Sequence, residues 1–415
     1  MISVEEALVK ILANVKVLEP ETKPILESLG QVLAEDVHSD INIPPLDNSA
    51  MDGYAIIAAD TRGASEQSSK VLKVIDTVQA GTISRKKVVP GTAIRIMTGA
   101  PVPEGADSIV RFEDTDETKR SKNTAEIGVL TGVLKGKNVR RAGDDIAAGT
   151  LVLKKGIMIK PAHVGVLASL GRKTVTVIRR PKIAVLATGN ELTEVGKPLV
   201  AGKLYNSNSY VVAAEVLHYG GIPQVLGIAL DSEESLTAKV RQGLAADMLI
   251  TTGGVSLGDY DLVKDVLVKE GKISFWTVRM KPGKQLAFGT LPGANGEIPH
   301  LGLPGNPVST MITFEMFARP CILKMMGKTK FEKETIEAVI EDNIENEGGL
   351  RLFARATVEK RNGQYYARTT GPQGSHILTS MSAADGLVVV NENQPFVKSG
   401  DKVKVIRLDR RGEEF

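Results

Sequence analysis

The chain has 415 residues, with 52 Lys and Arg against 49 Asp and Glu, a formal charge of +3, and only 4% aromatic residues. At roughly 150 residues per domain, this length predicts about three domains with real cores. The balanced charge and the scarcity of aromatic rings argue against a basic groove or a base-stacking surface, so we expect no nucleic-acid binding.

No apolar run approaches the roughly 18 residues that a membrane-spanning helix needs. The first six residues include two glutamates where a secretory signal would be basic. The single cysteine, Cys321, excludes an internal disulfide and any cluster of thiolates around zinc. We therefore expect a cytoplasmic protein with no membrane segment.

The first predicted element is an amphipathic helix. Ser3 and Glu6 have the spacing of a capping box, and the apolar residues after them share one helical face. A second helical stretch covers 161–170, and we expect the two helices to pack together in a discontinuous helical domain of residues 1–43 and 143–179. Residues 44–142 carry short apolar alternations broken by Gly, Pro and Asp, which predicts an inserted β domain.

Strand and helix patterns alternate through 180–329, as in the runs 183–187, 207–217, 223–230, 236–244 and 248–251. This alternation predicts an α/β domain with a doubly wound parallel sheet. In 330–415, two β-type runs flank Asn362 and Gly363, a strong hairpin signal. The last domain is therefore predicted to be β, with a barrel-like form.

Ligands of open α/β sheets bind beyond the carboxyl ends of the strands, so the loops that follow the predicted strands are the candidate site. One loop carries Gly253 and Gly254, whose backbone N–H groups could approach a phosphate. A tight strand-to-helix turn would use the same two glycines. No G-x-G-x-x-G motif or complete Walker A motif occurs, which disfavours dinucleotide dehydrogenases and P-loop ATPases.

Three carboxylates, Glu191, Asp231 and Asp261, fall on loops predicted to share this edge. Hard oxygen ligands of this kind suit a Mg²⁺ ion that holds substrate phosphates. The alternative is that the two aspartates cap the helices that follow them.

Two further segments are candidates for anion binding. Lys281 and Lys284 stand three residues apart across a Pro-Gly turn, either as an anion site or as a solvated turn. Residues 304–307 (PGNP) predict a rigid ledge ahead of a helix. The histidines show neither metal-ligand spacing nor a nucleophile motif beside them, so we expect structural roles for His38, His163, His218, His300 and His376.

Eight motifs, taken together and in order, resemble the molybdopterin molybdenumtransferases, the family of MoeA proteins and of the gephyrin E domain. The resemblance spans nearly the whole chain. The motifs are 44–54 (PPLDNSAMDGY), 96–107 (IMTGAPVPEGAD), 141–145 (RAGDD), 188–192 (TGNEL), 253–258 (GGVSLG), 281–284 (KPGK), 303–309 (LPGNPVS) and 374–376 (GSH).

The resemblance implies an enzyme that inserts molybdate into adenylylated molybdopterin and releases AMP with the help of Mg²⁺. It also implies a homodimer of four-domain subunits. Each active site would be shared between the MogA-like α/β domain of one chain and the β domains of the other. Transient contact with molybdopterin adenylyltransferase is a further expectation.

By position, the resemblance implies catalytic roles for Asp52, Thr98, Asp145, Glu191 and Asp231, and metal ligation by Glu191, Asp231 and Asp261. The substrate-binding residues that it implies are Gly253, Gly254, Ser256, Lys281, Lys284, Pro304, Asn306, Pro307, Ser309, Arg355 and Ser375.

Three alternatives stay open at this point. Tungstate could replace molybdate. The chain could be a molybdopterin-binding scaffold without turnover, although it retains every carboxylate of the expected site. It could also be a molybdopterin adenylyltransferase, although that enzyme lacks the additional β domains.

Overall fold

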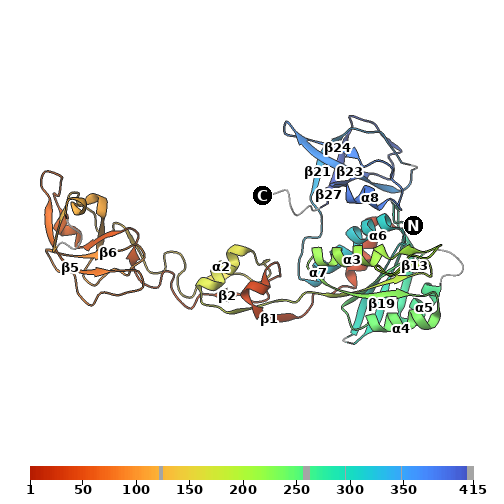
Figure 1. Ribbon diagram of the computed structural model, residues 1–415, viewed down its shortest axis with the longest axis horizontal. Helices are drawn as coiled ribbons and strands as arrows, with labels where there is room; N and C mark the ends of the chain where they lie inside the picture. The colour runs from red at the N-terminus through yellow and green to blue at the C-terminus, as the bar shows by residue number, and fades with distance from the viewer. Residues whose placement is uncertain (121–124, 256–261, 295, 347, 409–415) are drawn as a thin grey trace. The chain divides into compact units, whose positions relative to one another are not determined.

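The computed structural model describes residues 1–120, 125–255, 262–294, 296–346 and 348–408. The chain forms two units (Figure 1). The larger unit comprises Met1–Thr22, Gly30–Ala34 and Thr176–Phe415, and the smaller unit comprises Lys23–Leu29 and Glu35–Val175. The finer division into four domains stays a prediction.

A mixed β-sheet with the strand order β15-β12-β16-β20-β19-β17 organises the α/β part of the larger unit. Strands β15, β12, β16 and β20 run parallel, as expected, and β19 and β17 add an antiparallel edge. Only a few residues separate β19 from β20, and so short a connection permits only antiparallel pairing. The bounds are β12 (Lys182–Thr188), β15 (Ile222–Ala229), β16 (Met248–Thr252), β17 (Lys272–Thr277), β19 (Gln285–Gly293) and β20 (Gly296–Leu303).

Helices cover both faces of this sheet, which confirms the doubly wound prediction. Alternate residues of β12 enter different cores: Ile183 and Val185 pack with α3, α6 and α7, whereas Ala184 and Leu186 pack with α4 and α5. Strands buried on both faces in this way are continuously apolar. The helices are α3 (Ser207–His218), α4 (Glu233–Gly243), α5 (Leu262–Glu270), α6 (Pro307–Thr313), the π-helix η5 (Phe314–Ala318) and α7 (Arg319–Met325).

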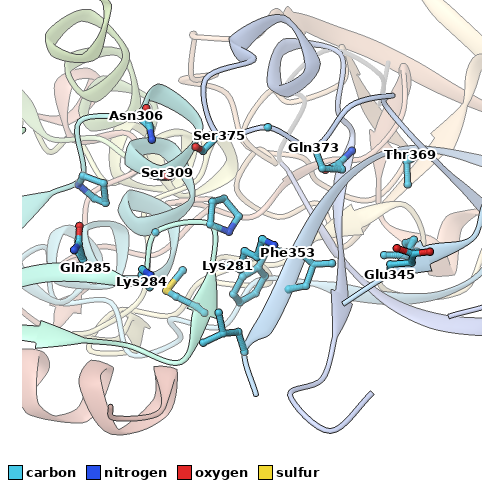
Figure 2. A pocket seen from close by; sticks show the side chains of 18 of the residues that line it. Lys281, Lys284, Gln285, Asn306, Ser309, Glu345, Phe353, Thr369, Gln373 and Ser375 are labelled. Carbon is cyan, nitrogen blue, oxygen red and sulfur yellow. The ribbon is translucent and has the colours of Figure 1, made fainter. Parts of the chain in front are cut away.

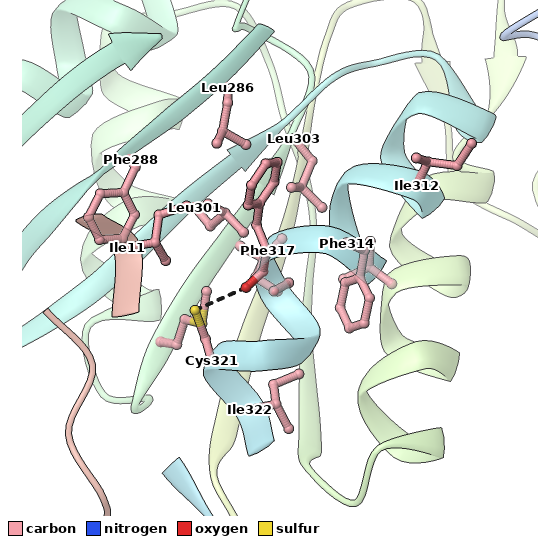
Figure 3. Close-up of a cluster of buried hydrophobic side chains, with 14 of the residues drawn as sticks. Ile11, Leu286, Phe288, Leu301, Leu303, Ile312, Phe314, Phe317, Cys321 and Ile322 are labelled. Atoms are coloured by element: carbon pink, nitrogen blue, oxygen red, sulfur yellow. Dashed lines mark hydrogen bonds between the residues drawn. The ribbon is translucent and has the colours of Figure 1, made fainter. Parts of the chain in front are cut away.

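The N-terminal helix α1 (Val4–Ala13) begins at the predicted cap, where the Ser3 hydroxyl accepts a hydrogen bond from the Glu6 backbone at 3.0 Å. Its apolar face is buried in the core of the larger unit, in the same cluster of buried side chains as Phe317 of η5 (Figure 3). The predicted pairing of this helix with residues 161–170 is therefore wrong, because η5 and α7 already cover that face.

The C-terminal strands close into a barrel, because β25 pairs with β23 as well as with β27. Arg361 pairs with Gln364 across Asn362 and Gly363, which have φ angles of 49° and 85°. The predicted hairpin is thus confirmed, with the positive φ values that a two-residue turn of this kind requires. The barrel strands are β21 (Thr335–Ile340), β23 (Arg351–Arg361), β24 (Gln364–Thr369), β25 (Gly386–Val390) and β27 (Lys402–Arg407).

Shorter elements complete the larger unit, and strands β1 (Pro20–Pro24) and β11 (Thr174–Ile178) carry the chain across the boundary between the units. The shorter elements are β13 (Leu192–Thr193), β14 (Leu204–Tyr205), β18 (Met280–Lys281), β22 (Ile344–Glu345), α8 (Leu378–Ser382) and β26 (Phe396–Val397). None of the helices within the described ranges combines the length and the apolarity needed to cross a bilayer.

The smaller unit contains a β-sheet with the order β7-β4-β6-β5-β8, where the sequence predicts β structure. Its members are β4 (Gly53–Ile56), β5 (Lys70–Val78), β6 (Thr92–Ile96), β7 (Ser108–Arg111) and β8 (Glu126–Val129). The unit also holds helix α2 (Pro161–Ser169) and the strand pairs β2 (Val37–His38) with β10 (Leu151–Leu153), and β3 (Asn48–Ser49) with β9 (Val139–Arg140).

Phe317 is fully buried between the sheet and its covering helices, so Phe317→Ala should leave a cavity. We expect the free energy of unfolding of the larger unit to fall by about 3–5 kcal/mol. Trp276, the single tryptophan, packs against the same core, so its fluorescence in a urea titration reports this unit. As a control, Val268→Ala on α5, at a side chain 50% exposed, should change the free energy of unfolding by less than about 0.5 kcal/mol. Equal losses in the two variants would contradict the prediction.

Candidate functional site

The carboxyl ends of β12, β16 and β20 lie side by side because these strands are parallel neighbours. The loops after them, with Asp231 after β15, surround a cavity of about 500 Å³, which we call the edge pocket. Six predicted site residues line it: Glu191, Asp231, Gly253, Gly254, Pro304 and Asn306. Two others, Ser256 and Asp261, lie outside the described residues.

Asp231 joins two of these loops. One of its carboxylate oxygens, Oδ2, accepts a hydrogen bond from the Asn190 backbone at 3.0 Å, and its own backbone N–H donates to the Asn190 side-chain oxygen at 3.1 Å. Ser232 caps α4 instead, through a hydrogen bond from the Ser235 backbone at 3.3 Å. The alternative role of Asp231 as the helix cap is therefore wrong.

Gly253 and Gly254 both have positive φ angles, of 87° and 64°. A Cβ atom on Gly254 would lie 2.4 Å from a methyl group of Val263, and one on Gly253 would lie 2.8 Å from the Thr188 carbonyl oxygen. The turn therefore needs glycine at both positions for steric reasons alone. Phosphate binding by this turn is compatible with its place in the pocket and stays a prediction.

The carboxylates of Glu191 and Asp231 line the same pocket. Such a donor set fits Mg²⁺, which usually takes one or two carboxylates and completes its shell with water and substrate phosphates. Within the described residues, no group of three or more His, Cys, Asp or Glu side chains could hold a metal ion on its own.

His300 is fully buried beside Thr251, and burial lowers its pKa to about 3, in keeping with the structural role expected of it.

A second cavity, of about 750 Å³, lies where the α/β part meets the barrel; we call it the lysine pocket (Figure 2). Gln285, Pro304 and Asn306 line both cavities, so the two pockets adjoin. The predicted residues that line the lysine pocket are Lys281, Lys284, Pro304, Asn306, Ser309 and Ser375.

The turn that carries the two lysines is held from both sides. Strand β18 pairs with β23, which places Lys281 beside Leu352 of the barrel. Gly283 has a φ angle of 91°, and a Cβ atom there would lie 2.5 Å from a methyl group of Thr313 on α6. The turn is therefore packed tightly against α6 and is not a loose, fully solvated loop.

The loop with Ser375 is fixed to α6 by a hydrogen bond of 3.1 Å from the Val308 backbone to the Ser375 carbonyl oxygen. This bond keeps Ser375 beside Ser309 at the wall of the lysine pocket (Figure 2). Pro307 is the first residue of α6, after the N-cap residue Asn306. It shapes the ledge but, among the described residues, is not part of the lining of either pocket.

Arg355 is almost completely buried and, within the described residues, is not part of the lining of the lysine pocket. Its guanidinium donates hydrogen bonds of 2.9 Å to Ser380 Oγ and to the Pro372 carbonyl oxygen. Its backbone N–H donates to Gln373 Oε1 at 2.8 Å. Arg355 thus supports the loop that carries Ser375, and direct anion binding by Arg355 stays a prediction.

The remaining predicted residues belong to the smaller unit. Asp52 Oδ1 accepts hydrogen bonds from the Thr98 backbone at 2.7 Å and from the Thr98 hydroxyl at 2.9 Å. The bond from the Thr98 backbone contributes most, and together the two bonds lower the pKa of the Asp52 carboxyl. Asp145 stands on another loop, where its backbone N–H donates to the Ile43 carbonyl oxygen at 3.0 Å.

Several residues of the two pockets were not among the predicted site residues. Gln285 lines both pockets and could have been found, because it directly follows Lys284. The barrel end of the lysine pocket was not predicted as part of the site, since its residues are far apart in the chain and, of them, only Gly374 falls in a quoted motif. They are Asn343, Ile344, Glu345, Leu350, Leu352, Phe353, Thr369, Gly371, Gln373 and Gly374.

Three successive regions of the chain match known protein families. Residues 2–171 match the MoeA N-terminal region (domain I and II), residues 184–324 match a probable molybdopterin binding domain, and residues 337–408 match the MoeA C-terminal region (domain IV). The fold and the matched regions define a multidomain protein with an α/β domain of the molybdopterin-binding type.

The molybdopterin molybdenumtransferase 2 of Mycobacterium tuberculosis is 36% identical over 98% of this chain and 99% of its own length. The molybdopterin molybdenumtransferase of Haemophilus influenzae is 35% identical over 98% of both chains. A crystal structure of the molybdopterin biosynthesis MoeA protein from Pyrococcus horikosii has 31% identity and a TM-score of 0.83, over 98% of this chain and 99% of that one. The chain therefore belongs to the MoeA family of molybdopterin molybdenumtransferases.

The support that Arg355 gives to the Ser375 loop can be tested without any ligand. Arg355→Met removes both guanidinium hydrogen bonds, so the amides of residues 371–377 should exchange with deuterium at least about tenfold faster, as the loop opens more often. Arg368→Met, at an exposed arginine of the same barrel, is the control and should leave this exchange unchanged. Unchanged exchange in Arg355→Met would show that the loop holds its place without the guanidinium.

Proposed function

We propose that this chain inserts molybdate, or tungstate, into adenylylated molybdopterin and releases AMP in a Mg²⁺-dependent reaction. The observation that carries the proposal is the contact between two different pockets. One is lined by carboxylates and a glycine turn, and the other is lined by two lysines, and they share Gln285, Pro304 and Asn306. The relatives named molybdopterin molybdenumtransferase, which match over the full length, support the same activity.

The reaction brings a nucleotide phosphate close to a tetraoxoanion, and this creates strong repulsion. At about 4 Å and an effective dielectric constant of about 20, each pair of like unit charges costs about 4 kcal/mol. Cations on both sides of the contact must offset that repulsion. A pocket whose carboxylates would hold Mg²⁺, next to a pocket lined by two lysines, suits this requirement.

In our proposal, the edge pocket takes the phosphates, with Glu191, Asp231 and Asp261 as the residues that hold Mg²⁺. The ion would neutralise phosphate charge and polarise the bond to AMP. Lys281, Lys284, Ser309 and Ser375 bind the oxyanion in the lysine pocket, and Arg355 holds the loop that carries Ser375 in place.

The direct test is to incubate the protein with adenylylated molybdopterin and Mg²⁺, with either molybdate or tungstate. AMP release and metal-loaded cofactor should both appear, and they should stop when Mg²⁺ is removed by chelation. The oxyanion with the higher kcat/KM identifies the substrate. No turnover with either oxyanion, together with tight binding of molybdopterin, would favour the scaffold. Adenylylation of molybdopterin from ATP would favour the adenylyltransferase.

The division of the site between two pockets predicts separable defects. Lys284→Ala should raise the molybdate concentration for half-maximal rate about tenfold or more, because a charge-assisted contact is lost. The KM for adenylylated molybdopterin should change much less, and Lys284→Arg should be intermediate because its donor geometry differs. Lys272→Ala, at an exposed lysine of β17, is the control. Equal weakening of both substrates would assign Lys284 to the nucleotide phosphates.

We further propose a homodimer in which Asp52, Thr98 and Asp145 of one subunit complete the pockets of the other. The proposal rests on the family resemblance and on the Asp52–Thr98 contact, which holds a carboxylate at the surface with no role in a buried core. Activity in the cytoplasm and transient contact with molybdopterin adenylyltransferase belong to the same proposal.

Complementation tests the shared site. Chains with Asp52→Ala and chains with Asp231→Ala should each be inactive, but random mixing and refolding should restore about a quarter of the wild-type activity. Half of the dimers are then heterodimers, and one of their two sites is intact. A mixture as inactive as its parents, despite heterodimers shown by mass spectrometry, would place the two aspartates in sites that do not meet.

A further inference from the structure

The lysine pocket is much larger than an oxyanion requires. Its volume of about 750 Å³ lies in the range of cavities that hold drug-sized organic ligands. A tetrahedral oxyanion beside Lys281, Lys284 and Ser309 would occupy only one end. The rest of the cavity extends over the barrel, toward Glu345 and Thr369 (Figure 2).

The middle of the pocket is apolar. Leu350, Leu352 and Phe353 line it, and Figure 2 shows Phe353 between Lys281 and Glu345. Flat ring systems favour such surfaces, since they can bury both faces against hydrocarbon and aromatic side chains. The end with the lysines therefore leads into a surface suited to a heterocycle.

At the barrel end, most polar side chains already bond to the chain itself. Thr369 Oγ1 donates to Asp342 at 2.8 Å, and the Asn343 side-chain oxygen accepts from the Ser399 backbone at 2.9 Å. The Gln373 amide is committed to the backbone of Arg355 and Gly371, which fixes the loop.

Glu345 is different. It stands at the end of β22, and its carboxylate forms no hydrogen bond or ion pair with any residue in the described part of the chain. A carboxylate only accepts hydrogen bonds, so it selects a ligand edge made of N–H donors and repels an anion. The pocket thus offers cations at one end and an acceptor at the other.

We propose that the barrel end of the lysine pocket binds the pterin ring of the substrate, with the Glu345 carboxylate accepting hydrogen bonds from its aminopyrimidinone edge. The inference rests on the proposed function and adds the place of the heterocycle to it. In adenylylated molybdopterin, the sulfur atoms and the phosphate chain leave one side of the molecule, and the aminopyrimidinone edge lies at the other. That order matches phosphates in the edge pocket, the oxyanion at the lysines and the ring over Leu352 and Phe353.

The first test uses pterin itself, whose own fluorescence reports binding, and lumazine, in which an oxo group replaces the amino group. The wild type should prefer pterin about tenfold or more, and Glu345→Gln should lose most of that preference, because an amide no longer offers two charged acceptor oxygens. The control Glu337→Gln, at an exposed carboxylate of β21 in the same barrel, should keep it. A preference for pterin that survives in Glu345→Gln would overturn the inference.

The second test uses the full substrate. Glu345→Gln should raise the KM for adenylylated molybdopterin about tenfold while leaving the half-maximal molybdate concentration unchanged. If pterin alone binds the wild type too weakly to measure, this KM decides, and an unchanged KM overturns the inference. AMP release with no dependence on Glu345 would leave the proposed function standing without the pterin site. Pterin binding that depends on Glu345, without AMP release, would support the pterin site and sink the proposed function.

Discussion

The pairing of β18 with β23 is the constraint on which the candidate site depends. It is short, with Met280 opposite Arg351 and Lys281 opposite Leu352, yet it joins the turn of the α/β sheet directly to the barrel. Backbone hydrogen bonds of this kind fix distance and direction at once. Because the barrel closes on itself through β23 and β25, β23 cannot shift without disturbing its partners. The lysine pocket therefore lies between two structures held in place by this strand pairing and by a hydrophobic cluster that joins sheet residues such as Leu286 to Phe353 and Leu387 of the barrel.

The residues shared by both pockets explain why the two cavities adjoin. Gln285 starts β19 directly after the lysine turn, while Pro304 and Asn306 follow β20. These two strands are antiparallel neighbours, so the start of one lies beside the end of the other. The boundary between the pockets is thus set by the geometry of the sheet, which keeps the two cavities adjacent.

Local sequence patterns predicted the helices, strands and turns well, because the residues that form each element lie next to one another in the sequence. The Ser3 cap, the Asn362–Gly363 hairpin and the alternation of strands and helices after residue 180 were all confirmed. The partner of α1 was not predictable in this way, because an apolar helix face can pack on any apolar surface. The helices that it packs against, η5 and α7, lie some 300 residues away in the chain. Glu345, Leu352 and Gln373 were missed for the same reason: their proximity comes from barrel closure and not from spacing in the sequence.

Steric demand and ligand binding are hard to separate at the glycines of the site, and the structure shows why. Gly254 and Gly283 both need positive φ angles, and both lie too close to a neighbouring side chain to accept a Cβ atom. A turn packed so tightly brings backbone N–H groups and lysines to a fixed place with little freedom left to lose. Binding of a charged ligand then costs less ordering entropy than it would on a loose loop. The fold requires these glycines whether or not a ligand binds, so their presence in a sequence cannot by itself distinguish a turn from a phosphate site.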